Sequence, residues 1–179
     1  MHNLNVLPRS ICLLAAILFC AKPFAETFEL DSQKFIDIAS INSVSEIETA
    51  KVALQKSASP AVQNYAQAMI TENTTYLNEL RSLASQHHLS MPSDVELQTK
   101  ARKYVFERKG QDFDRAYAGM RAAERRKMVN LYRQAINSND ASFKIYAETA
   151  LPSLMQQLYE AQKLLQTVDS TSHFVANNI

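Results

Sequence analysis

Three residue types are scarce in this chain of 179 residues, which has two glycines, two cysteines and no tryptophan. Loops that cradle phosphates and dinucleotide-binding turns need several glycines, so the composition excludes nucleotide-binding folds of that kind. Tight turns between antiparallel strands also favour glycine, which argues against a sheet of many strands. The composition therefore favours a helical protein.

The first 25 residues have the pattern of a secretory signal. Arg9 precedes an unbroken apolar run from Ile11 to Cys20, and Ala25 offers a small residue for cleavage. The run is much shorter than the roughly 20 apolar residues that a membrane-spanning helix needs. We therefore predict a signal peptide over 1–25, export to the periplasm, and no transmembrane span in the mature chain. A position peripheral to the outer membrane is left open.

Removal of this segment also removes both cysteines, Cys12 and Cys20. The mature chain would then have no disulfide and no thiol nucleophile. The remaining sequence contains neither the Gly-x-Ser-x-Gly pattern of serine hydrolases nor the His-Glu-x-x-His pattern of zinc proteases. We therefore predict that the protein is not an enzyme.

From Asp31 onward the apolar residues recur at helical spacing. The pattern predicts long helices over about 32–57, 59–88, 112–137 and 140–168, and a shorter helix over about 93–109. We expect one bundle domain over 26–169 and a disordered tail over 170–179. The connection that holds the short helix is long enough to cross the bundle, which would leave the second and third long helices parallel. The fold class predicted is all-α: a ferritin-like four-helix bundle with a short extra helix in the middle crossover. An up-and-down bundle with an appended helix is the alternative.

Each predicted inward stripe contains one polar residue near the middle of its helix, and the four residues should meet at one height. One interpretation is a hydrogen-bonded layer that fixes the register of the helices. A second is a degenerate metal site for iron or manganese, with Glu72 as an extra ligand, although such a site would lack imidazole ligands. A third is that one stripe has been assigned the wrong register. The four residues are Glu46, Asn73, Glu124 and Gln157.

Basic residues concentrate in 100–133, which holds 11 basic and 4 acidic residues. Glu124 is placed on the inward stripe of this region by its helical spacing. Arg121, Arg125 and Arg126 would then form a face for an anionic envelope surface or an acidic partner. The alternative is that acidic and basic hairpins pack together as solvated faces. Nucleic acid is not an expected partner outside the cytoplasm.

Several segments carry a resemblance to a known family. They include Ser45 to Glu48 (SEIE), Gly110 to Tyr117 (GQDFDRAY) and Leu151 to Leu154 (LPSL). Over about Phe35 to Val168 the chain resembles the domain of unknown function 4142 family, whose members are ferritin-like exported bacterial proteins. The resemblance thus implies the same fold and the same destination as the residue patterns.

The resemblance also bears on the polar layer. Members of the family typically have Asp-His where this chain has Glu72-Asn73, and histidine where it has Glu124 and Gln157. Of the family's polar residues, only Glu46 is kept here. The resemblance therefore implies that this chain has lost any metal site of the family, or has changed it to favour a hard, carboxylate-preferring ion.

Together these observations favour an exported, non-enzymatic helical bundle that binds or supports a component of the cell envelope. No resident cofactor is expected under this interpretation. The alternative is a ferritin-like metal-binding or oxidase protein with a carboxylate site in the bundle core. The sequence names neither the ligand nor the oligomeric state.

Overall fold

The computed structural model describes residues 31–101 and 110–176, all of whose regular structure is helical. The helices are α1 (Ser32–Lys56), α2 (Pro60–Gln86), α3 (Asp94–Ala101), α4 (Gly110–Ala135) and α5 (Ala141–Ala176). The predicted signal peptide and residues 102–109 of the predicted short helix lie outside the described residues. The all-α bundle is confirmed.

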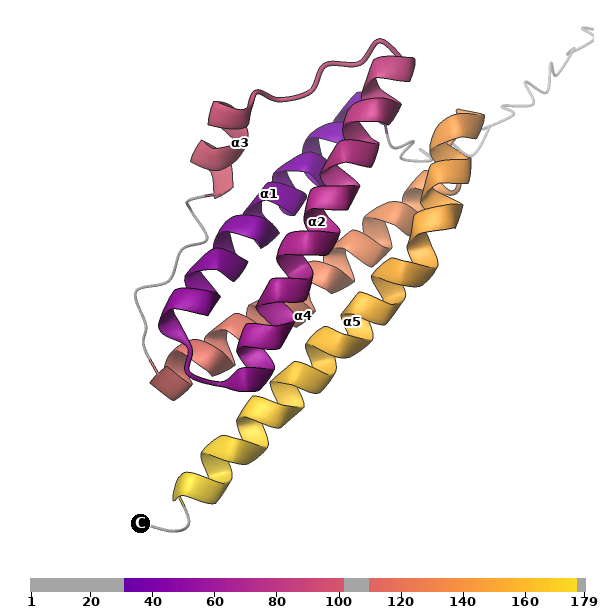
Figure 1. Ribbon diagram of the computed structural model, residues 1–179. Coiled ribbons are helices and arrows are strands. Elements are labelled where there is room, and N and C mark those ends of the chain that lie inside the picture. Colours follow the sequence, from indigo (N-terminus) through magenta and orange to yellow (C-terminus); the bar gives the residue numbers. More distant parts are fainter. Residues whose placement is uncertain (1–30, 102–109, 177–179) are drawn as a thin grey trace, which may run out of the picture.

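The four long helices form two antiparallel hairpins, α1 with α2 and α4 with α5 (Figure 1). The residues that pack together establish how the hairpins are oriented. Val62, near the start of α2, shares an apolar cluster with Phe113, near the start of α4. At the other end Leu80 of α2 shares a cluster with Met128 of α4. Helices α2 and α4 are therefore parallel, as the predicted crossover requires.

Local signals in the sequence explain where several helices begin. The Asp31 carboxylate accepts a hydrogen bond from the backbone N–H of Gln33 at 3.2 Å, and Asp140 accepts one from Ser142 at 2.9 Å. Ser93 accepts from the N–H of Glu96 at the start of α3. These side chains satisfy backbone donors that have no partner within the first helical turn.

Helix α5 continues to Ala176, so it includes most of the segment predicted to be a disordered tail. Residues 170–176 contain neither glycine nor proline, and nothing in their backbone chemistry ends a helix. The Ser170 hydroxyl donates to the carbonyl of Gln166 at 2.7 Å, a bond that forms within a continuing helix. The polar composition of the segment was a poor guide to its conformation. Residues 177–179 lie outside the described part of the chain.

The apolar core is divided into two main clusters, one at each end of the bundle. One includes Phe35, Leu80, Tyr132 and Phe143, and the other includes Val62, Phe113 and Leu164. Buried polar side chains form a layer between these two clusters. Helix α3 packs on α1 through Leu97, which is fully buried in a small cluster with Val44 and Leu77. No helix within the described ranges is long and apolar enough to cross a membrane.

Candidate functional site

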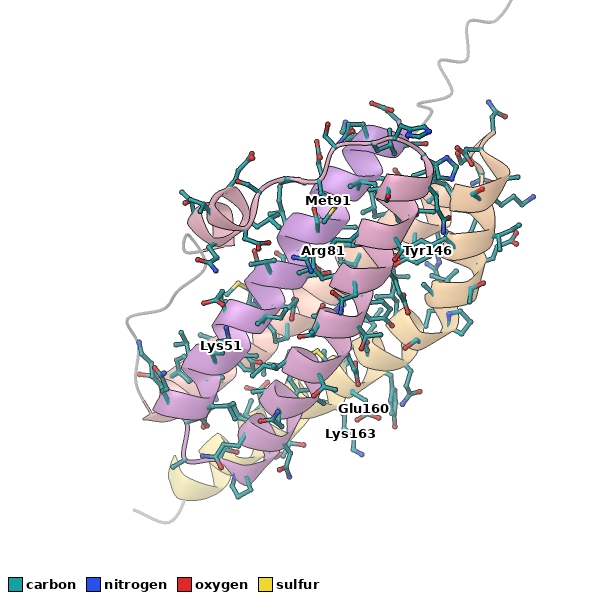
Figure 2. All side chains as sticks on the ribbon, turned by 45° about the horizontal axis from the view of Figure 1, so that its top comes forward. Lys51, Arg81, Met91, Tyr146, Glu160 and Lys163 are labelled. Carbon is teal, nitrogen blue, oxygen red and sulfur yellow. The ribbon has the colours of Figure 1, made fainter. Side chains whose placement is uncertain are left out.

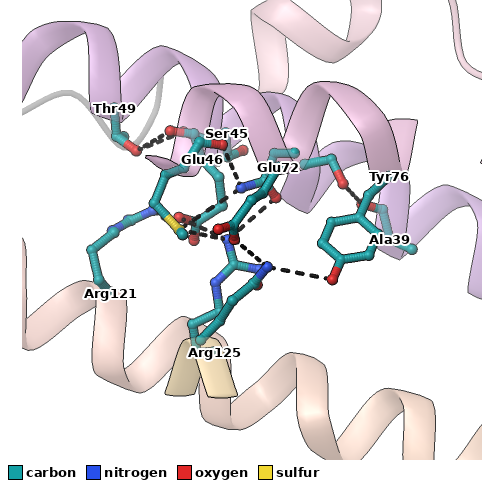
Figure 3. Close-up of polar contacts among 12 residues, drawn as sticks. Ala39, Ser45, Glu46, Thr49, Glu72, Tyr76, Arg121 and Arg125 are labelled. Atoms are coloured by element: carbon teal, nitrogen blue, oxygen red, sulfur yellow. Dashed lines mark hydrogen bonds and ion pairs between the residues drawn. The ribbon is translucent and has the colours of Figure 1, made fainter. Parts of the chain in front are cut away.

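An ion-pair cluster occupies the centre of the bundle (Figure 3). Glu46 extends from α1 toward two arginines of α4. Its Oε1 lies 2.7 Å from Nη1 of Arg121, and its Oε2 lies 3.3 Å from Nη2 of Arg125. Each of the three side chains is 1% exposed. One carboxylate is thus held between two guanidinium groups in a region that water does not reach.

Further contacts hold the two arginines in place. Arg125 Nη2 donates to Oδ1 of Asn73 at 3.2 Å, and the Asn73 amide donates to the carbonyl of Met69 at 2.8 Å. The guanidinium carbon of Arg121 lies 5.5 Å from the ring centre of Tyr117, in a cation–π contact. These neighbours add polar and aromatic contacts to the ion pairs, and Nε of each arginine makes no hydrogen bond with the described residues.

The protonation of Glu46 follows from these contacts. Burial alone would raise the pKa of its carboxyl, because water no longer solvates the charge. The positive charges of Arg121 and Arg125 outweigh that effect and hold the pKa of Glu46 below its ordinary value. Nearby, burial and the charge of Glu46 raise the pKa of Tyr65 to about 12. At neutral pH the cluster therefore contains one carboxylate, two guanidinium groups and a neutral phenol.

A second polar group, formed by the side chains of Glu72, Tyr76, Ser153 and Gln157, connects α2 to α5. The Gln157 amide donates to Oε2 of Glu72 and, at 3.4 Å, to the hydroxyl of Tyr76. The Tyr76 hydroxyl donates in turn to Ser153 Oγ at 2.8 Å. Glu72 is only half buried, and that burial raises the pKa of its carboxyl against the opposing charge of Arg125. This group therefore lies between the ion-pair cluster and solvent.

The structure buries three of the four residues predicted to form the polar layer, and it links Glu46 and Asn73 through Arg125, whereas Gln157 belongs to the second polar group. Glu46, Asn73 and Gln157 are 1%, 1% and 4% exposed. Glu124 is not among them, because it pairs with Lys127 at 2.7 Å at the rim of the bundle. The register assigned to α4 was therefore wrong at this point: Arg121 and Arg125 occupy the interior position given to Glu124.

The predicted basic face is corrected for the same reason. Arg121 and Arg125 are buried and paired with Glu46, so they offer no charge to a surface or partner. Arg126 alone of the three is exposed. A face built on all three arginines is not present in this fold.

A different reading of the α4 sequence would have found the buried arginines. Phe113, Tyr117, Arg121 and Arg125 follow one another at four-residue steps and are each at most 1% exposed. Alternating three- and four-residue steps led from Tyr117 through Met120 to Glu124 instead. The sequence feature that indicated buried arginines was Glu46, a single inward carboxylate on α1. A buried carboxylate needs a cation opposite it.

The residues present do not fit a transition-metal site. Within the described residues, no three side chains of His, Cys, Asp or Glu lie close enough together to hold an ion. Glu46 is already neutralised by Arg121 and Arg125, whose positive charge would repel a metal cation. The carboxylate of Glu72 accepts from Gln157, an amide in place of the imidazole that such metals prefer.

A groove follows the seam between α2 and α5. Its larger part has a volume of about 840 Å³ and a mostly apolar lining that includes Tyr76 and Leu83 of α2 and Ile145 and Tyr146 of α5. Figure 2 shows Tyr146 on α5 beside α2, with Glu160 and Lys163 further along α5. These two residues line a smaller cavity of about 370 Å³.

The two cavities meet beside the second polar group. Glu72 and Ser153 line both of them, and Gln157 lines the smaller one. The arrangement has a volume in the range of small-molecule sites and combines an apolar wall with a few convergent polar groups.

Comparison with known proteins identifies the family and nothing more specific. No curated protein and no solved structure matches the chain. The family described as a domain of unknown function, DUF4142, matches residues 21–164, which is most of the chain. The protein therefore belongs to the DUF4142 family.

Proposed function

We propose that this protein is an exported, non-enzymatic bundle of the cell envelope that binds a small ligand in the groove between α2 and α5. The observation that carries the proposal is the groove itself, where an apolar wall meets Glu72, Tyr76 and Ser153. The pattern of residues 1–25 supports export.

The ion-pair cluster has a structural role under this proposal. Glu46, Arg121 and Arg125 fix the register of α1 against α4, and they leave no open position for a ligand because all three are buried. The groove, in contrast, is bordered by exposed residues such as Thr75 and Thr149. Binding is therefore assigned to the α2–α5 seam.

Two threonines of α2 provide a matched test. Thr75 and Thr74 are adjacent and exposed, and each donates its hydroxyl to the carbonyl four residues earlier. Thr75 lines the groove, whereas Thr74 lines none of the cavities described above. A tryptophan at 75 should fill the groove, and one at 74 should point into solvent.

The experiment is native mass spectrometry of the full chain, expressed in cells that naturally carry it and purified from their envelope fraction. We expect a processed protein with a bound small molecule in the wild type and in Thr74→Trp, and loss of that molecule in Thr75→Trp. A bound molecule that survives in Thr75→Trp would overturn the assignment to the groove. Recovery of the unprocessed chain from the cytoplasm would overturn export.

A further inference from the structure

We propose that the α2–α5 groove takes an elongated aliphatic cation with an ammonium group at each end, the chemistry of linear diamines and polyamines. The inference rests on the proposed function and specifies its ligand class. It comes from the placement of two carboxylates, one buried amide oxygen and the apolar wall between them.

The first observation is the charge of the groove. Glu72 and Glu79 both line its larger part, and no lysine or arginine is among the described residues that do so. The two glutamates are seven residues apart on α2, which is two helical turns or about 10.5 Å along the axis. They therefore share one face of the helix and present two negative charges at a fixed spacing.

The second observation is a buried acceptor without a donor. Both amide hydrogens of Gln157 are used, one toward Glu72 and one toward Tyr76. Its Oε1 is buried and receives no hydrogen bond from the described residues, and the side chain as a whole is only 4% exposed. A buried acceptor in this state is costly, and a ligand N–H placed beside it would remove that cost.

The orientation of the Gln157 amide is fixed by its neighbour. An ionised carboxylate only accepts hydrogen bonds, so the amide nitrogen must face Glu72 and the oxygen must face away. The Glu72 carboxylate and the Ser153 hydroxyl oxygen, both acceptors, line the junction of the two cavities, and the Gln157 side chain lines the smaller cavity beside them. An ammonium group has three donors and no acceptor, which is the complementary chemistry.

The third observation is the surface between the two carboxylates. Tyr76 lies between Glu72 and Glu79 on α2, and Tyr146 and Ile145 face the groove from α5. Methylene groups of a ligand would bury apolar surface there, and the tyrosine rings offer faces to a cation. A neutral apolar ligand would add no donor to Glu72, which already accepts from Gln157, or to the Gln157 oxygen, and an anion would be repelled.

The test is isothermal titration calorimetry with three probes on the envelope-purified protein: diaminooctane, diaminobutane and octylamine. Diaminooctane is long enough to approach both carboxylates, whereas diaminobutane is too short and octylamine has one charge. We expect diaminooctane to bind at least fivefold more tightly than either of the others. Equal affinity for diaminooctane and octylamine would overturn the two-ended recognition.

Three variants locate the binding. Glu72→Gln should weaken diaminooctane binding about tenfold, because Glu72 is half buried, and Glu79→Gln should weaken it about threefold, because Glu79 is exposed. Glu148→Gln removes the same charge from an exposed position of α5 outside the groove and should change nothing. If Glu148→Gln weakens binding as much as Glu79→Gln, the attraction is a general charge effect and the proposal fails. The exposed position of Glu79 keeps the test valid even if Glu72→Gln alters the fold.

Failure of this inference is distinguishable from failure of the proposed function. If the molecule that Thr75→Trp displaces is neutral or anionic and diaminooctane does not bind, the groove is a binding site but its ligand class is wrong. If Thr75→Trp displaces nothing and diaminooctane still binds with the expected dependence on Glu72 and Glu79, the ligand class stands. A basic peptide that binds the groove in place of the diamine would overturn the inference.

Discussion

At the scale of single residues, one carboxylate neutralises the two buried arginines at the centre of this bundle. Glu46 lies between Arg121 and Arg125 with no access to water, and all three depend on one another. Removing one member of a buried ion pair leaves an uncompensated charge, which costs far more than losing a surface pair. The consequences of altering Glu46 and Glu72 should therefore differ sharply.

Glu46→Gln should lower the free energy of unfolding by about 3–5 kcal/mol, because two guanidinium groups would remain buried without a counter-charge. Glu72→Gln, at a half-buried carboxyl, should leave it within about 0.5 kcal/mol of the wild type. Urea unfolding followed by circular dichroism measures both. Equal effects of the two substitutions would contradict the structural role assigned to Glu46.

The stabilisation by Glu46 should depend on pH. Its pKa in the folded protein is lower than the ordinary value of 4.5, so the unfolded chain binds the proton more tightly. The contribution is fully present above pH 4.5 and is lost as the pH falls through the folded pKa. The difference in unfolding free energy between wild type and Glu46→Gln should therefore stay constant from about pH 7 to about pH 5 and shrink at lower pH. A difference that grows on acidification would contradict a lowered pKa.

The sequence predicted part of this cluster. Glu46 and Asn73 were found from helical spacing, as was Gln157 of the second polar group, because each is a polar residue in a mostly apolar stripe. Arg121 and Arg125 were not, because arginine is rarely buried and its long side chain allows a position at the edge of a stripe to reach the interior. Only the pairing with Glu46 across two helices makes their burial favourable, and that pairing is a property of the tertiary structure.

At the scale of helices, the sequence predicted most boundaries to within a few residues. Helices α1, α3 and α5 begin at or beside the expected positions, directly after Asp31, Ser93 and Asp140. The side chains of these three residues accept hydrogen bonds from backbone N–H groups in the first turn of each helix. The end of α5 was wrong because no comparable stop signal precedes Ala176. Helix starts have a local chemical cause, whereas the sequence between Val168 and Ala176 contains no stop signal.

The short helix α3 offers a test at this scale. Leu97 is fully buried against α1 and α2, whereas Val95 is 76% exposed. Leu97→Ala should detach α3 and raise amide hydrogen exchange across Asp94–Ala101, with a loss of about 2–3 kcal/mol if α3 unfolds with the bundle. Val95→Ala is the matched control and should leave exchange unchanged. Unchanged exchange in Leu97→Ala would show that Leu97 does not anchor the helix.

At the scale of the whole molecule, two hairpins meet along a polar centre and leave a groove at the α2–α5 seam. The bundle and its crossover could be predicted, since they depend on helix lengths and on the length of the connection. The groove could not, because its volume depends on how far apart two helices lie. Glu79, Tyr146 and Ser153, which border it, resemble any other residues at the edge of a helix when only the sequence is considered.

The central claim is that the protein binds at the α2–α5 seam and not at the bundle centre. The most direct test is to map backbone amide chemical shifts by NMR while adding the small molecules extracted from the envelope of the cells that carry the protein. The account predicts shift changes at Thr71–Ser82 of α2 and Ser142–Ser153 of α5, and none at Glu46 or Arg121. Changes centred on Glu46 and Arg121, with the seam unaffected, would contradict it.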